Sequence, residues 1–173
     1  DRTQVLSPYD ILHRNPVHCS SAMIRKEALS RSGLFVPRLG GAAEDTEMWA
    51  RIAKHGKVAL TAPHLTFMRD HHSNTTKTYE YRRRRIASLA FMRDAWSDDR
   101  RATQIVSGNL RANLVAVAYE ASDRGDYRLA GKYFLQASAM SPLNIKWLLK
   151  GLVYRMGLKS WVRPLPRETR GGF

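Results

Sequence analysis

The sequence predicts an α/β fold over residues 1–76, followed by an all-α segment that ends in a helical-hairpin extension. Short apolar runs separated by Gly, Pro and polar residues occupy the first part, which is typical of short strands among short helices. Beyond residue 76, such runs give way to long segments in which apolar residues recur at helical spacing. We therefore expect a linking helix at 77–100 and a helical extension at 101–173.

The first part alternates between strand and helix patterns. Its apolar runs are short enough for strands, and glycines end the two helical patterns, at Gly33 and Gly56. The patterns predict, in order, a strand at 18–24, a helix at 26–31, a loop at 34–41, a helix at 44–55, and strands at 58–60 and 65–68. A polar loop at 71–76 follows the last strand.

The second part predicts four helices, at 78–96, 102–123, 127–140 and 143–156. Ala130, Phe134, Ala137 and Pro142 occur at the spacings of the second half of a tetratricopeptide repeat. The preceding helix has Ala118 where that repeat has glycine. We therefore expect a single tetratricopeptide-like hairpin covered by one further helix, and not a repeat array.

The composition is that of a globular protein with a basic surface. The chain has 173 residues, of which 43% are hydrophobic, and its 29 Lys and Arg against 15 Asp and Glu give a net charge of +14. Such a surface attracts phosphates, anionic lipids or nucleic acid. The single cysteine excludes an internal disulfide, and no apolar run reaches the eighteen residues typical of a membrane span. A start without Met or a signal-like segment suggests part of a longer protein.

An acidic pair, Glu44 and Asp45, begins the helix expected at 44–55. Helical spacing puts Asp45 on the face of Trp49 and puts Glu44 on the face of Glu47 and Arg51, so Asp45 is expected to point inward. Arg51 is expected to be an exposed partner of Glu47 across one helical turn. The positive end of the helix dipole keeps an acid at this position ionised, as a general base requires. The alternative is a structural role, because acids in a first turn commonly cap the helix.

A longer pattern surrounds this pair. It consists of Asn15-Pro16, then Ser-Ser-Ala-Met-Ile-Arg at 20–25, Gly-Leu-Phe at 33–35, Glu-Asp-Thr-Glu-Met-Trp-Ala-Arg at 44–51, and Arg-Asp-His-His-Ser at 69–73. In order and spacing, this pattern resembles the acceptor-side half of family 2 glycosyltransferases of the GT-A fold, over roughly residues 12–76. The resemblance implies that the α/β part is a partial GT-A domain, which is Rossmann-like.

The resemblance also implies a reaction. In such enzymes the aspartate of the Glu-Asp pair, here Asp45, deprotonates an acceptor hydroxyl that attacks the anomeric carbon of a nucleotide-sugar with inversion. The acceptor is expected to be a glycan or lipid-linked molecule, as in polysaccharide biosynthesis. A divalent metal, Mg or Mn, is expected to be bound mainly by an N-terminal half with an Asp-x-Asp element, which this sequence lacks. We therefore expect the chain alone to be inactive.

Further site residues follow from the same resemblance. Glu44, Arg25, Arg69 and Trp49 are expected to bind substrate, and His71 is expected to reach the diphosphate or its metal. Each has a structural alternative. Arg25 would then be a solvated element end, Trp49 a core residue and His71 a polar loop residue.

The basic C-terminal region favours a different interpretation. Residues 146–173 contain seven Lys or Arg and one Glu, a net charge of +6, interleaved with aromatic and aliphatic residues. This composition suits a peripheral contact with an anionic membrane, or aromatic residues that pack on the helical hairpin. The alternative function is a non-catalytic helical-repeat module that binds a protein, nucleic acid or membrane. For the enzyme we expect a cytoplasmic location, peripheral at the inner face of the membrane, and no nucleic-acid partner.

Overall fold

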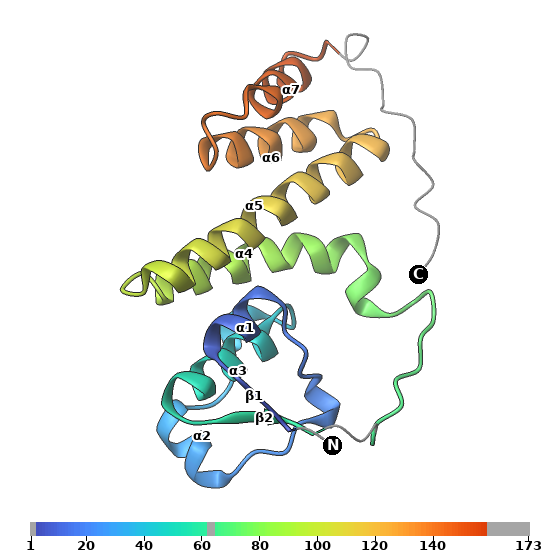
Figure 1. The fold of residues 1–173 in the computed structure, drawn as a ribbon. Coiled ribbons are helices and arrows are strands. Elements are labelled where there is room, and N and C mark those ends of the chain that lie inside the picture. Colours follow the sequence, from blue (N-terminus) through green and yellow to red (C-terminus); the bar gives the residue numbers. More distant parts are fainter. Residues whose placement is uncertain (1–2, 62–64, 159–173) are drawn as a thin grey trace. The chain divides into compact units, whose positions relative to one another are not determined.

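The computed structural model describes residues 3–61 and 65–158. It is mostly helical, at 65%, and the described residues form seven α-helices and one two-stranded sheet (Figure 1). Two compact units divide the chain, residues 1–113 and 114–173. The division lies inside one long helix, whereas the sequence analysis expects boundaries near residues 76 and 100.

The predicted α/β fold is wrong. The sheet consists of β1 (Gln4–Leu6) and β2 (Val58–Leu60), which pair antiparallel with Val5 opposite Ala59. A Rossmann-like GT-A domain needs parallel strands joined by helical crossovers, and the described residues contain no parallel pair. The first part of the chain is therefore a helical unit with a short β-ribbon.

Two predicted strands do not form because neither finds a partner strand. Residues 18–24 contain a 3-10 turn at Cys19–Ser21, and residues 65–68 are exposed, irregular backbone. A strand is stabilised by hydrogen bonds to a neighbour, and short apolar runs do not reveal whether one exists. The strand predicted at Val58–Leu60 is confirmed as β2.

Four helices and part of a fifth build the first unit. Two were predicted almost to the residue, α2 (Lys26–Ser32) and α3 (Glu44–His55), and α4 (Tyr79–Ala95) is close to its predicted range. The sequence analysis missed α1 (Pro8–His13), which a capping box between Ser7 and Asp10 and a proline in the first turn initiate. The long helix α5 (Arg100–Asp123) begins in this unit.

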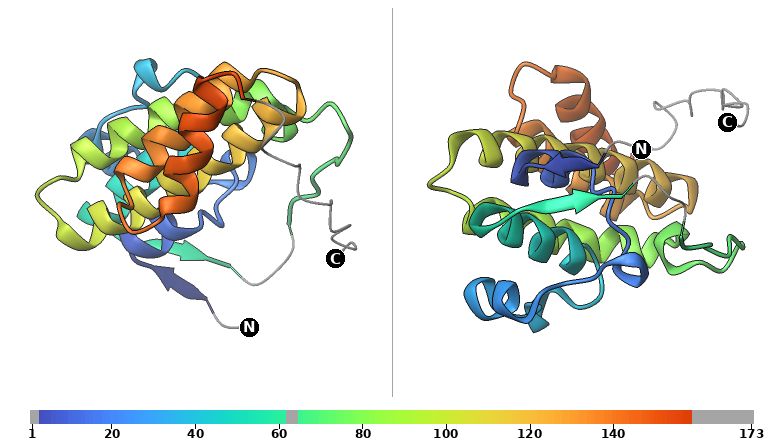
Figure 2. Two further views of the ribbon diagram at one scale, coloured as in Figure 1. Left: turned by 90° about the horizontal axis from the view of Figure 1, so that it is seen from above. Right: turned by 60° about the horizontal axis from the view of Figure 1, so that its bottom comes forward.

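Helix α3 is the centre of the first unit, since α1, α2 and β2 all pack against it (Figures 1 and 2). Its buried residues include Met48, Trp49 and Ile52, and α1, which packs against it, contributes the buried Ile11 and Leu12. Asparagines of α5 hold the neighbouring helix ends. The Asn109 amide donates to the Leu12 carbonyl at 2.7 Å, and the Asn113 amide donates to the Arg82 carbonyl at 2.8 Å.

The second unit contains the end of α5, α6 (Tyr127–Ala139) and α7 (Ile145–Arg155), close to the predicted helices (Figure 2). The residues that match the repeat spacing, Ala130, Phe134 and Ala137, are fully buried. Helices α6 and α7 approach closely at Gly131 of α6 and Gly151 of α7. A Cβ on Gly151 would lie 2.7 Å from the Leu135 side chain, so this crossing requires the smallest residue.

Candidate functional site

The start of α3 is formed by an unusual turn. Gly40, Gly41 and Ala43 all have left-handed backbone angles, with φ of 58°, 76° and 66°. Among the described residues Ala43 is the only non-glycine with positive φ, and it is buried. This conformation costs an alanine about 1 kcal/mol or more, and such strain gathers at functional sites. The turn presents Glu44 and Asp45 at the very first positions of the helix.

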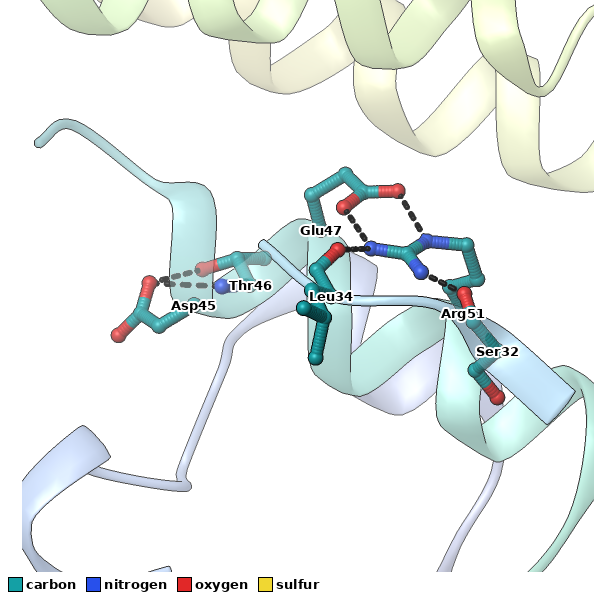
Figure 3. A network of polar contacts seen from close by, with 6 residues as sticks. All are labelled: Ser32, Leu34, Asp45, Thr46, Glu47 and Arg51. Atoms are coloured by element: carbon teal, nitrogen blue, oxygen red, sulfur yellow. Dashed lines mark hydrogen bonds and ion pairs between the residues drawn. The ribbon is translucent and has the colours of Figure 1, made fainter. Parts of the chain in front are cut away.

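The Asp45 carboxylate is held by one oxygen only. Its Oδ1 accepts from the Thr46 backbone N–H at 2.6 Å and from the Thr46 hydroxyl at 3.3 Å. Its Oδ2 accepts no hydrogen bond from a described residue, and the side chain is half-buried. The carboxylate points away from the Glu47–Arg51 pair (Figure 3). Asp45 is thus oriented by its helix and keeps one oxygen open.

The predicted contrast between the two acids of the pair is not seen. Glu44 and Asp45 are both half-buried, and the carboxylate buried in α3 is Glu47, which leaves 3% of its surface exposed. Glu47 lies in the same first turn, where its carboxylate is bonded to Arg51. The predicted orientation of the two acids was inferred from α3 alone, whereas the burial of a side chain also depends on residues outside its own helix.

Helix α4 contributes Tyr81, which lies within reach of the Asp45 charge, and Arg85, whose charge also acts on Tyr81. Burial raises the pKa of the Tyr81 phenol, and the negative charges of Asp45 and Glu44 raise it further, while Arg85 opposes the shift. Tyr81 therefore stays neutral and protonated. The Arg85 Nε is buried and has no hydrogen-bond partner among the described residues. The sequence analysis did not assign either residue to the site, because Arg85 belongs to a run of four arginines that is typical of a solvated helix face.

Glu47 and Arg51 form a closed structural pair. The Arg51 Nε donates to Glu47 Oε1 and its second terminal nitrogen donates to Oε2, both at 2.8 Å. The same guanidinium donates to the carbonyls of Ser32 and, at 2.9 Å, Leu34 (Figure 3). Glu47 raises the pKa of Arg51, so the cation persists. The predicted helical pairing of these residues is confirmed, and it ties α3 to the end of α2.

A cavity of about 1020 Å³ opens beside α3 in the first unit. Residues 16–25, α2, the later turns of α3 and β2 line it. Its charged and titratable lining is mostly basic and consists of His18, Arg25, Arg31, His55 and Lys57 against the single acid Glu27. Apolar residues also line it, among them Trp49, Ile52 and Val58, and Leu65, Thr66 and Met68 of the irregular segment contribute to the wall. The cavity suits a ligand that carries both a negative charge and an uncharged, partly apolar body.

Hydrogen bonds connect the start of α3 to this cavity wall. The Asn15 amide nitrogen donates to the Thr46 hydroxyl at 3.2 Å, and its amide oxygen accepts from the Val17 backbone N–H at 2.9 Å. Val17 lines the cavity, and Thr46 holds Asp45. Asn15 therefore fixes the geometry between the carboxylate and the wall, although Asp45 itself does not line the cavity.

The other predicted site residues are divided between two places. Arg25 and Trp49 both line the cavity; Arg25 is exposed, whereas Trp49 is 4% exposed and its ring meets Phe35 edge to face. Arg69 and His71 are exposed residues of irregular backbone and do not line the cavity. The His71 Nδ1 lies 2.8 Å from the Ser73 hydroxyl. The structure therefore places Arg25 and Trp49 at the same cavity, whereas Arg69 and His71 are not part of its lining.

His71 does not stand in a metal site built by the described residues. No group of three or more His, Cys, Asp or Glu side chains comes close enough in residues 3–61 and 65–158 to hold an ion. The Mg or Mn expected from the resemblance would be bound mainly by an N-terminal half, so its binding stays a prediction.

Comparison of the chain with protein-family models, with curated protein sequences and with solved structures found no match. The described helices also include none with the length and apolar character needed to cross a membrane. Any function must therefore be argued from the residues at the start of α3, the adjacent cavity and the helical second unit.

Proposed function

We propose that the chain supplies the acceptor side of an inverting sugar transferase, in which Asp45 is the general base. The observation that carries this proposal is the half-held Asp45 carboxylate, with Oδ1 bonded to Thr46 and Oδ2 open. A base needs a fixed orientation and a free lone pair, and this arrangement provides both. The type of reaction is proposed from the sequence pattern around Asp45, which resembles that of family 2 glycosyltransferases.

In the proposed reaction, Asp45 Oδ2 takes the proton of an acceptor hydroxyl. The hydroxyl oxygen then bonds to the anomeric carbon of a nucleotide-sugar, and the bond from that carbon to the nucleoside diphosphate breaks with its electron pair on the phosphate oxygen. Attack from the face opposite the leaving group inverts the configuration. Neutral Tyr81 does not compete with Asp45 as a base.

The basic cavity supports a phosphate-bearing substrate. Arg25, Arg31 and Lys57 contribute cations to its lining, and a guanidinium binds phosphate oxygens well in pairs of hydrogen bonds. Asn15 couples this lining to Thr46 and so to Asp45. A lipid-linked acceptor that carries phosphate, or the nucleotide-sugar donor, meets the charge requirement, whereas an uncharged glycan does not.

The decisive experiment is Asp45→Asn in the full-length protein, with release of nucleoside diphosphate from a panel of nucleotide-sugars as the readout. Loss of the base should lower the turnover number by about 100-fold or more with little effect on substrate KM. The matched control is Asp123→Asn, the same change at an exposed carboxylate of α5, which should retain the activity. Undiminished turnover by the Asp45→Asn protein would refute the assignment.

A further inference from the structure

Helix α7 carries an apolar stripe on its exposed side. We call this set the α7 stripe, and it consists of Ile145, Leu148, Leu149, Leu152 and Met156, of which the last directly follows the helix. These five residues each leave 41% to 63% of their surface exposed. Their spacing of three, four, seven and eleven positions from Ile145 puts them on one side of the helix.

The opposite side of α7 packs into the second unit, so the stripe is not part of the core. Tyr154 is buried, stacks beside Phe134 and lies with its hydroxyl 2.9 Å from that of Ser122. Gly151 is buried against Leu135 of α6. Lys150 also turns inward, where its ammonium lies 4.5 Å from the ring centre of Tyr119. The helix therefore has two apolar sides, of which one is covered.

Exposed cations flank the α7 stripe on both sides. At about 100° per residue, Lys146 lies roughly a quarter turn to one side of the stripe and Arg155 roughly a quarter turn to the other. Both side chains are exposed, and α7 contains no Asp or Glu. An apolar centre with a positive charge on each side is typical of a helix that lies in the headgroup region of a membrane.

We propose that α7 docks on an anionic lipid bilayer, with the α7 stripe among the acyl chains and Lys146 and Arg155 at the lipid phosphates. The helix lies in the plane of the surface, because eleven residues extend only about 16 Å, roughly half the hydrocarbon thickness. A second copy of the chain is a poorer occupant, since pairing two α7 stripes would bring the same cations together without a compensating acid. This inference does not depend on sugar transfer.

The first test removes the apolar centre. Flotation of the 173-residue chain with phosphatidylcholine vesicles that contain about one-third phosphatidylglycerol should show binding, and Leu149→Ser with Leu152→Ser should weaken it by about tenfold or more. Both positions are exposed, so circular dichroism should show an unchanged fold. The matched control is Val5→Ser with Phe67→Ser, two exposed apolar residues of the first unit, which should bind as the unsubstituted chain does.

The second test removes the flanking charge. Lys146→Gln with Arg155→Gln should reduce binding to the anionic vesicles by about 25-fold, since each cation near such a surface contributes about fivefold. Arg128→Gln with Lys132→Gln is the control, because it removes the same charge from exposed positions of α6. Binding should fall with added salt and should be weak on pure phosphatidylcholine.

Three outcomes would overturn the proposal. The first is absence of binding to the anionic vesicles. The second is equal loss of binding in the α7 and control variants, which would show that net charge or overall surface hydrophobicity governs lipid binding. The third is concentration-dependent self-association that the Leu149→Ser and Leu152→Ser changes abolish without affecting lipid binding, which would assign the α7 stripe to a second copy.

Discussion

Two carboxylates of the same helix, Asp45 and Glu47, have opposite surroundings. Glu47 is buried, and both of its oxygens are bonded to the Arg51 guanidinium. Asp45 is half-buried, and only its Oδ1 is bonded, to Thr46 in its own helix. The two residues stand two positions apart, yet one is neutralised by a cation that also binds two carbonyls and the other keeps an open oxygen.

The difference shows that the hydrogen-bond partners available to a carboxylate, and not its residue type, separate a structural acid from a reactive one. A carboxylate with both oxygens bonded to a cation holds the fold together, because removing the carboxylate leaves the cation without its counter-charge. A carboxylate with an unused oxygen can still take a proton. We therefore expect substitutions of Glu47 and its partners to lower the free energy of unfolding, and substitutions of Asp45 to lower the turnover number.

The largest stability effect is expected for Glu47→Gln. The change leaves the partly buried Arg51 cation without its counterion and should lower the free energy of unfolding by about 3 kcal/mol. Urea unfolding followed by circular dichroism measures this difference. Asp45→Asn is the control and should change the unfolding free energy by less than about 0.5 kcal/mol. Equal destabilisation by both variants would abolish the distinction drawn between the two acids.

A smaller loss is expected for Gly33→Ala, at the turn that Arg51 holds. Gly33 has φ 78° and ψ 177°, a conformation essentially restricted to glycine, and a Cβ there would lie 3.2 Å from an Arg51 terminal nitrogen. We expect a loss of about 2 kcal/mol in the unfolding free energy. Gly108→Ala in α5 has open space around its Cβ and should instead stabilise by about 0.5 to 1 kcal/mol. Similar results for both substitutions would exclude the backbone explanation.

The turn before Asp45 should respond in the other direction. Ala43→Gly relieves the left-handed strain but removes a buried methyl group, so the net gain in stability should be small, roughly 0.5 kcal/mol. Ala42→Gly, at the adjacent buried position without positive φ, should destabilise by roughly 1 kcal/mol. Thermal unfolding distinguishes the two, and a loss for Ala43→Gly as large as that for Ala42→Gly would show that packing outweighs strain there.

The smallest effect concerns a fully partnered carboxylate outside α3. The backbone N–H of Ala102 and the hydroxyl of Tyr9 hold the pKa of Asp99 below its usual value of 3.8. Because the folded pKa is lower than the unfolded one, the stabilisation is complete above the unfolded pKa and is lost as pH falls through the folded pKa. Asp99→Asn should therefore flatten the decline in melting temperature below about pH 4. Identical pH profiles for the two proteins would contradict this linkage.

Local and non-local information contributed differently to the predictions. The periodicity of apolar residues located α2, α3, α4, α5, α6 and α7 within a few positions, because helical hydrogen bonds join residues four apart. The strands at 18–24 and 65–68 were wrong, because a strand depends on a partner distant in the sequence. The fold class failed with them, since it was inferred from those strands and from a family resemblance.

The candidate site shows the same limit. The Glu44-Asp45 pair was found from its position at a helix start, and the Glu47–Arg51 pair from its spacing of four residues. Tyr81, which lies more than thirty residues further along, was not found. Its proximity to Asp45 arises when α4 packs in the first unit, and nothing in the neighbouring residues indicates that contact.

The sequence by itself determined where six of the seven described helices lie, where α3 begins and that Glu44 and Asp45 are its first two residues. Only the tertiary structure decided which carboxylate of α3 is buried against Arg51 and which keeps an open oxygen, and which side of α7 remains exposed. The physical reason is that helix formation depends on contacts within a few residues, whereas burial, ion pairing and free surface depend on which distant segments meet.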